Sequence, residues 1–216
     1  WFCALLIGYW LMLKFNSAPG FPRGDLTMQG NFASYIDRLL LPGRLYEKIH
    51  DPEGLGSLIP AIGTGLLGIL TGNFLKNSPR TPSKKAMWLA IAGVIALILP
   101  QIWNLDFPIN KNLWTSSFVL RTGGISLLLI ALFYYIIDVL GHRKWAFFFK
   151  VIGMNSILIY MSGHFISWSY TNNAFFQWLG QLIGDPYNAV ALAITLLAVK
   201  WVFLYVLYRK KIFLKV

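Results

Sequence analysis

Long apolar runs separated by short polar connections dominate this chain of 216 residues. Because about 20 apolar residues of helix cross the hydrocarbon core of a bilayer, runs of this length predict transmembrane helices. Six runs approach or exceed this length, at residues 1–15, 55–75, 86–103, 113–138, 146–168 and 187–207. The pattern therefore predicts an all-α fold, a polytopic membrane helical bundle with about six transmembrane helices in this chain.

Composition supports a membrane environment, with the lipid bilayer as the first partner. Hydrophobic residues make up 56% of the chain and charged residues 12%, which is not typical of a soluble domain. The net charge of +11 comes mostly from short loops, as topology signals do, and therefore does not indicate a nucleic-acid partner. Because the first run begins at Trp1, with no Met and no basic segment before it, we expect further helices to precede it.

Basic residues also predict the orientation. The connections at 76–85 and 141–144 and the tail at 209–216 contain four, two and four Lys or Arg residues, and all three fall on one side if six helices alternate. By the positive-inside rule that side is cytoplasmic, and with it the C-terminus. The loops at 16–54, 104–112 and 169–186 are then external.

The external loop at 16–54 is expected to contain a short helix lying along the membrane interface. Apolar residues recur at helical spacing after Asn31, and Pro42-Gly43 would end the helix. In the DPEG sequence that follows, Asp51 is a good N-cap, Pro52 suits the first helical position and Glu53 complements the helix dipole. Alternatively, Asp51 and Glu53 form a carboxylate rim that meets sugar hydroxyls or an amine.

Arg121 interrupts the apolar run at 113–138. On a helix it would share one stripe with Trp114, Ser117 and Gly124, about 12 Å below the external end. A charge at that depth requires an ion-pair partner, a carbonyl or an aqueous cavity. Arg121 is therefore either a buried structural residue or a site residue that binds an anionic or carbonyl group.

The run at 146–168 carries the polar residues Asn155, Ser156 and His164. His164 has no partner at metal-ligand spacing, so no metal site is predicted. None of the three histidines lies near a Ser-Asp pair in the sequence, so no nucleophilic triad is predicted either. His164 is either a hydrogen-bonding residue near a helix end or a catalytic one.

Four blocks together resemble one family. The blocks YIDRLLLPGRLYEKIHDPEGLGSLIPAIGTGLLG, INKNLWTSSFVL, GMNSILIY and LYRKKIFLKV are similar, in the same order, to the heparan-alpha-glucosaminide N-acetyltransferase family and its bacterial relatives. The resemblance implies that residues 1–216 are the C-terminal part of a transmembrane acyltransferase domain. It also implies an enzyme that moves acetyl from cytoplasmic acetyl-CoA to the amine of a terminal glucosamine across the membrane. The absence of a glycosylation sequon in the external loop fits a bacterial member in the cytoplasmic membrane.

The resemblance also implies which residues bind substrate and which residue is absent. The family's proposed catalytic histidine lies in its N-terminal half, and no histidine here matches it, so we expect no catalytic residue in this chain. We expect this fragment alone to be inactive, with the base supplied by N-terminal helices of the same protein. The matched positions are candidate substrate-binding residues, together with Arg121 and His164, which lie outside the matched blocks. Those matched positions are Asp51, Glu53, Asn110, Lys111, Asn112, Trp114, Asn155 and Ser156.

A different class remains open, a non-catalytic transporter or scaffold with a polar intramembrane cavity for an anionic solute. Arg121 and Asn155 would line its passage. Acetyl-CoA-dependent acetylation of glucosamine favours the enzyme, and solute flux without acetyl transfer favours the transporter. A homo-oligomer is compatible with either.

Overall fold

The structure is a computed structural model that describes residues 1–41, 43 and 45–214. These residues form helices, turns and one isolated bridge between Leu45 and Lys48. The chain divides into two compact units, Trp1–Gly141 and His142–Val216, which we describe separately. The predicted all-α class is confirmed for the described residues.

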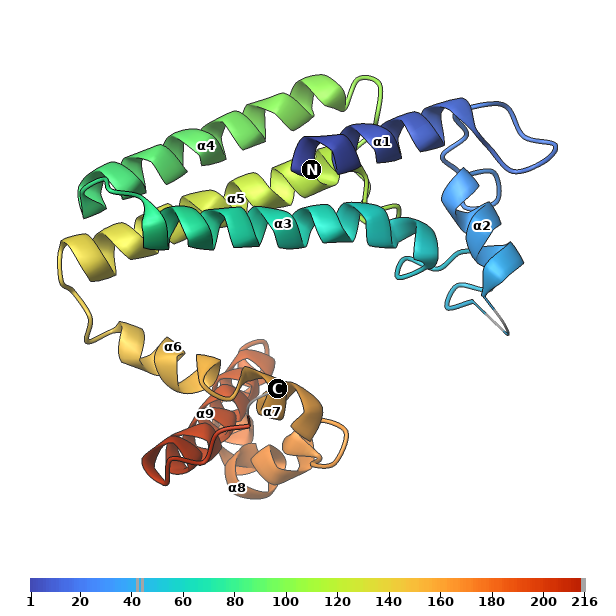
Figure 1. The fold of residues 1–216 in the computed structure, drawn as a ribbon. Coiled ribbons are helices and arrows are strands. Elements are labelled where there is room, and N and C mark those ends of the chain that lie inside the picture. The colour runs from blue at the N-terminus through green and yellow to red at the C-terminus, as the bar shows by residue number, and fades with distance from the viewer. Residues whose placement is uncertain (42, 44, 215–216) are drawn as a thin grey trace. The chain divides into compact units, whose positions relative to one another are not determined.

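The first unit is a bundle of long helices with one short helix across its end (Figure 1). Its elements are α1 (Phe2–Phe15), α2 (Phe32–Leu40), α3 (Leu55–Asn77), α4 (Pro82–Trp103), α5 (Ser116–Tyr134) and the π-helical turn η1 (Tyr135–Val139). In length and composition α3, α4 and the continuous stretch Ser116–Val139 can each cross a membrane. The 14 residues of α1 extend about 21 Å, which is short of the roughly 30 Å hydrocarbon core.

Helices α4 and α5 pack closely because glycines face each other. A Cβ on Gly124 would lie 3.0 Å from the Gly93 carbonyl oxygen, and a Cβ on Gly93 would lie 3.1 Å from the Gly124 carbonyl oxygen. Below this contact Leu89, Leu127 and Ala131 form a buried cluster. Small residues allow membrane helices to approach without a hydrophobic driving force between them.

The end of the unit at which α2 lies, which we call the α2 end, contains a second buried cluster and the two loops at residues 16–54 and 104–115. Tyr9, Leu13, Ala33 and Phe107 are buried together there. Two long-range hydrogen bonds fix α1 to the start of α5: the Tyr9 hydroxyl donates to the Leu113 carbonyl at 2.7 Å, and the Ser116 hydroxyl donates to the Leu6 carbonyl at 2.6 Å. The α2 end is the predicted external end.

The predicted short helix in loop 16–54 is present as α2. The side chain of Asn31 caps it by accepting from the Ser34 amide at 2.7 Å. The helix buries Ala33, Ser34 and Asp37 and leaves Leu39 and Leu40 exposed, an arrangement that suits an interfacial helix, although contact with lipid stays a prediction. Of the proposed terminator Pro42-Gly43, Pro42 lies outside the described residues.

The prediction that Asp51 caps the next helix is wrong. Helix α3 begins at Leu55 with Gly54 as its N-cap residue, and the free amides of its first turn are satisfied by Asp37 instead, whose Oδ1 accepts from the Gly56 amide at 3.2 Å. A Cβ on Gly54 would collide with the Asp37 carboxylate. Tertiary contact with α2 therefore replaces the local cap that the sequence suggested.

The second unit contains α6 (Ala146–Gly153), α7 (Ser156–Ser162), α8 (Trp168–Ile183) and α9 (Asn188–Arg209). Of these, α9 is long and apolar enough to cross a membrane. The prediction of one continuous transmembrane helix at 146–168 is wrong, because Met154 and Asn155 separate the two short helices α6 and α7. The prediction of a loop at 169–186 is also wrong, because most of it is α8. The predicted count of about six is approximate: four helices qualify as spans in the described residues.

The topology can be tested with single cysteines in a Cys3→Ala background. Gln29 and Ser83 are both exposed, whereas Ser34 is fully buried and unsuitable. Because loop 16–54 is predicted external and loop 76–85 cytoplasmic, Gln29→Cys should react with an impermeant maleimide on intact cells. Ser83→Cys should react only after permeabilisation. The reverse labelling pattern would overturn the orientation.

A second prediction concerns Asp37, whose pKa is raised from 3.8, chiefly by burial and further by the Asp51 charge, against hydrogen bonds from the α3 amides. A raised pKa means that ionisation destabilises the folded state, and that this penalty disappears as the pH falls through the folded-state pKa toward 3.8. Asp37→Asn keeps an acceptor for the α3 amides. In thermal unfolding at pH 7 this variant should be as stable as the parent or more stable, and the difference in stability should shrink toward pH 4.

Asp37→Ala serves as the comparison, because it leaves the α3 amides without an acceptor. It should cost about 1–3 kcal/mol in the free energy of unfolding. Equal destabilisation by the Asn and Ala variants at pH 7 would mean that the ionised carboxylate itself stabilises the junction.

Candidate functional site

A polar cavity of about 570 Å³ opens at the α2 end of the first unit. Two segments line it, one before α3 and one before α5. The lining residues are Tyr46, Glu47, Asp51, Pro52, Glu53, Lys111, Asn112 and Trp114. The structure thus brings together five of the candidate residues proposed from the sequence, which lie about 60 positions apart in the chain.

The segment before α5 owes its shape to Asn110. The Asn110 Oδ1 accepts from the amides of Asn112 at 2.8 Å and Leu113 at 3.3 Å, which closes a tight turn. Asn110 is therefore placed behind the cavity as a turn-forming residue and does not line it. The same turn leaves Lys111 and Asn112 exposed at the cavity surface.

Trp114 leaves the turn in the left-handed backbone region, with φ of 49°. Its indole N–H donates to the Thr64 hydroxyl on α3 at 3.3 Å, and its ring contacts Phe118 edge-on with centroids 5.4 Å apart. The sequence placed Trp114 on the same helix as Arg121, which is wrong because α5 begins at Ser116. The indole instead forms a wall between α3 and α5.

The cavity carries more negative than positive charge. Glu47, Asp51 and Glu53 contribute three carboxylates, and Lys111 contributes the one cation among the described lining residues. The Asp51 Oδ1 accepts from the Glu53 amide at 2.9 Å, while the Glu53 side chain is exposed. The arrangement suits a ligand with several hydrogen-bond donors and a positive charge.

His50 connects the two lining segments from behind, and the sequence analysis did not select it. It is buried, with its Nδ1 2.6 Å from the Ser34 hydroxyl and its Nε2 3.2 Å from the Asn112 carbonyl oxygen. Because a carbonyl only accepts, Nε2 carries the proton, so the Ser34 hydroxyl donates to Nδ1. His50 thus holds α2 against the turn that presents Lys111 and Asn112.

The Ser34–His50 contact corrects the expectation that no histidine lies near a Ser-Asp pair, since Asp37 and Asp51 are both close enough to interact electrostatically in this region. Ser34 nevertheless has no exposed surface, so its hydroxyl cannot meet a substrate. The pair therefore has a structural geometry and does not form a nucleophilic site. No sequence motif marks it, because its members are 16 positions apart.

Glu47 is the second residue that sequence reasoning missed. It lines the cavity, and its Oε2 is shielded from solvent without accepting a hydrogen bond from any described residue. Its location four residues before Asp51, in the same external loop, was the available signal. An unpaired carboxylate oxygen next to a polar cavity indicates capacity for a donor from a ligand.

A second cavity, of about 380 Å³, continues from the same tryptophan along the bundle. It lies between α3 and α5, shares Trp114 with the polar cavity, and has a mainly apolar lining. The hydroxyls of its lining residues Thr64, Thr71, Thr122 and Ser126 each donate to a carbonyl of their own helix.

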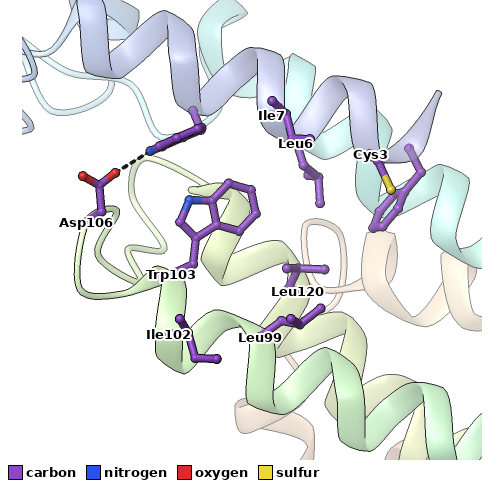
Figure 2. Close-up of a pocket in the computed structure, with 10 residues that line it drawn as sticks. Cys3, Leu6, Ile7, Leu99, Ile102, Trp103, Asp106 and Leu120 are labelled. Atoms are coloured by element: carbon purple, nitrogen blue, oxygen red, sulfur yellow. Dashed lines mark hydrogen bonds between the residues drawn. The ribbon is translucent and has the colours of Figure 1, made fainter.

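The larger cavity of about 620 Å³ in Figure 2 has a different character. Apart from Asp106 its lining is apolar or aromatic and comes from α1, α4 and α5. The Asp106 carboxylate already accepts from the Trp10 indole at 2.8 Å and from Lys14 at 2.5 Å, and these bonds, Lys14 first, lower the pKa of Asp106. This cavity contains none of the candidate residues.

Arg121 lies outside all of these cavities. It is exposed on α5, and no hydrogen bond or ion pair joins it to another described residue. The residues predicted to share one face of the helix with Arg121 differ from it in burial. Ser117 and Gly124 are buried, whereas Arg121 is exposed on the surface of the unit. A buried structural ion pair within the described residues is therefore not its role.

The remaining candidates belong to the second unit. The Asn155 Nδ2 donates to the Ile212 carbonyl at 2.9 Å and its Oδ1 accepts from the Leu214 amide at 3.0 Å, so Asn155 holds the C-terminal segment against the α6–α7 break. Ser156 and His164 are exposed. Among residues 1–41, 43 and 45–214, no group of three or more His, Cys, Asp or Glu side chains could hold a metal ion.

Comparison with known proteins identifies relatives over the whole chain. The chain is 33% identical to human heparan-alpha-glucosaminide N-acetyltransferase over 250 aligned residues, covering 100% of this chain and 37% of the human protein. It is 33% identical to the mouse protein of the same name over 240 residues, covering 96% of this chain and 36% of the mouse protein. No family model matches.

The chain thus spans little more than a third of the length of these two relatives. The identity nevertheless extends across both units, including the segments that line the polar cavity. With its apolar helices, the chain is part of an integral membrane protein. By sequence it belongs to the heparan-alpha-glucosaminide N-acetyltransferase family.

Proposed function

We propose that this chain is part of a membrane-embedded N-acetyltransferase that moves acetyl from acetyl-CoA to the amine of a glucosamine-type sugar across the membrane. The observation that carries the proposal is the polar cavity at the α2 end, which gathers Asp51, Glu53, Lys111, Asn112 and Trp114. Together with family membership, it supports an acceptor site on the predicted external face.

The lining suits a sugar in three ways. Carboxylates and the Asn112 amide can accept from hydroxyl groups, Lys111 can donate to them, and the Trp114 ring offers an apolar face. A cavity of about 570 Å³ falls in the range that encloses small ligands. Asp51 and Glu53 would hold acceptor hydroxyls, in line with the carboxylate rim expected from the sequence.

The transfer step requires a base that we assign outside this chain and donors that this chain could supply. The amine must be neutral to attack the thioester, a base must take its proton, and donors must hold the carbonyl oxygen as charge develops. The base remains assigned to N-terminal helices of the same protein. Lys111 or Arg121 could stabilise the developing oxyanion, whereas both polar atoms of the Asn155 amide are engaged in its own unit.

The acetyl donor would approach from the predicted cytoplasmic side, where residues 76–85 could attract the phosphates of CoA. Two of the basic residues there already have structural contacts. The Lys85 ammonium donates to the Leu75 carbonyl at 2.6 Å, and Arg80 lies over the rings of Phe74 and Trp88. Lys76 and Lys84 are therefore better candidates for a CoA contact. The positive-inside rule alone would also explain the basic residues of this loop, without any contact to CoA.

The first functional test uses the natural full-length protein and the 216-residue chain, each purified in detergent. With acetyl-CoA and glucosamine, the full-length protein should form N-acetylglucosamine, and the isolated chain should form none above background because its base is elsewhere. Mass spectrometry of the sugar product is the measurement. Turnover by the chain at the parent rate would refute the assignment of the base, and solute flux by a non-acetylating parent would favour a transporter.

The second functional test concerns Arg121. Its exposed position on α5 leaves its guanidinium available to a substrate or to another helix. In the full-length protein, Arg121→Lys keeps the charge but loses the planar donor fork, so we expect at least a tenfold lower acetylation rate with normal thermal stability. Arg121→Met should have the same or a larger effect. If the Met variant keeps both rate and stability, Arg121 has no part in the chemistry.

A further inference from the structure

We propose that Glu47 is the residue that recognises the ammonium group of the acceptor and so makes the cavity specific for amino sugars. This inference rests on the proposed function and adds to it the group that distinguishes an amino sugar from a neutral one. It is carried by the position of Glu47 in the cavity lining and by its Oε2, which is shielded from solvent and accepts no hydrogen bond from a described residue.

The backbone of Glu47 is fixed within a closed turn. Its amide donates to the His50 carbonyl at 3.0 Å, and its own carbonyl accepts from the Ile49 amide at 2.8 Å. His50 is in turn held by Ser34 and by the Asn112 carbonyl. The carboxylate is therefore presented from a turn that is tied to both lining segments, as a recognition group requires.

The Glu47 carboxylate has one oxygen without a hydrogen-bond partner among the described residues. Its Oε2 is shielded from solvent and accepts no hydrogen bond from any described residue, and no described Lys or Arg lies within ion-pair distance of it. A carboxylate oxygen removed from water and left unpaired raises the free energy of the site. A cationic ligand donor that reached this carboxylate would remove that penalty and would be bound strongly for the same reason.

The neighbouring carboxylates are less suited to this task. Glu53 is exposed, so solvent screens its charge and weakens its attraction for a cation. One oxygen of Asp51 already accepts from the Glu53 amide. Glu47 combines cavity lining with an unused, water-shielded oxygen, and this combination separates it from the other two.

A carboxylate that binds the ammonium group of the acceptor would also favour release of the product. A primary amine near neutral pH is largely an ammonium ion, with a pKa of about 8 for a comparable α-amino group. Once the base has taken one proton, the amine nitrogen bonds to the acetyl carbon as its bond to the CoA sulfur breaks, and CoA leaves as the thiol with the second proton. The product is a neutral amide, which no longer forms an ion pair with the carboxylate. The acceptor is therefore held and the product is released by the same residue.

The experiment compares Glu47→Gln with Glu53→Gln in the natural full-length protein. Both variants remove one negative charge from the same cavity and keep similar side-chain volume. Glu47→Gln should raise KM for glucosamine about 10–100-fold, the range for a lost charged hydrogen bond, with kcat changed less than about threefold. Glu53→Gln, which weakens only a contact with acceptor hydroxyls, should raise KM by less than about tenfold and should leave the preference for glucosamine over glucose unchanged. Equal effects of the two variants would overturn the proposal.

A binding ratio keeps the test decisive if Glu47→Gln is partly unfolded. Equilibrium binding of labelled glucosamine, competed with glucose, gives a preference that does not depend on the fraction of active protein. The parent should prefer glucosamine, and Glu47→Gln should lose most of that preference while Glu53→Gln keeps it. If the parent acetylates glucosamine but Glu47→Gln keeps the preference, this inference fails alone; if the parent neither binds nor acetylates glucosamine, the proposed function fails.

Discussion

Two hydrogen bonds to adjacent carbonyl groups, one buried and one partly buried, hold the turn at the α2 end of the first unit. The Tyr9 hydroxyl from α1 donates to the Leu113 carbonyl, and His50 from the loop before α3 donates to the Asn112 carbonyl. A loop between membrane helices has few ways to satisfy its backbone once it is buried, so side chains from both neighbours must supply the donors. The cavity exists because this turn is held from two sides.

The same constraint explains why the start of α3 differs from its sequence signal. Asp51-Pro52-Glu53 has the composition of a helix N-terminus, yet α3 begins three residues later, where Asp37 of α2 accepts from its amides. This releases Asp51 and Glu53 from the capping role and leaves them at the cavity surface. A tertiary contact that involves a residue 19 positions away cannot be inferred from local spacing.

Much of the architecture was predictable because apolar length is a direct physical signal. The ranges of α3, α4, α5 and α9 agree closely with the predicted spans, and a short helix was expected in the loop at 16–54, where α2 lies. The run at 146–168 was misjudged because composition does not reveal an interruption: Asn155 uses its side-chain amide to hold residues 212 and 214. The cavity residues near Asp51 and Trp114 were predicted, but His50 and Glu47 were not, since burial and missing partners are properties of the fold.

Charge is distributed along the chain in a way that fits the two substrates of the proposed reaction. The net charge is +11, but the cavity at the α2 end carries three carboxylates against one lysine. The basic residues are concentrated instead in the loops predicted to be cytoplasmic. A polyanionic donor such as acetyl-CoA would be attracted to that side, and a cationic acceptor to the opposite cavity. Each substrate would be disfavoured at the other's site, because its charge has the same sign as most of the charged groups there.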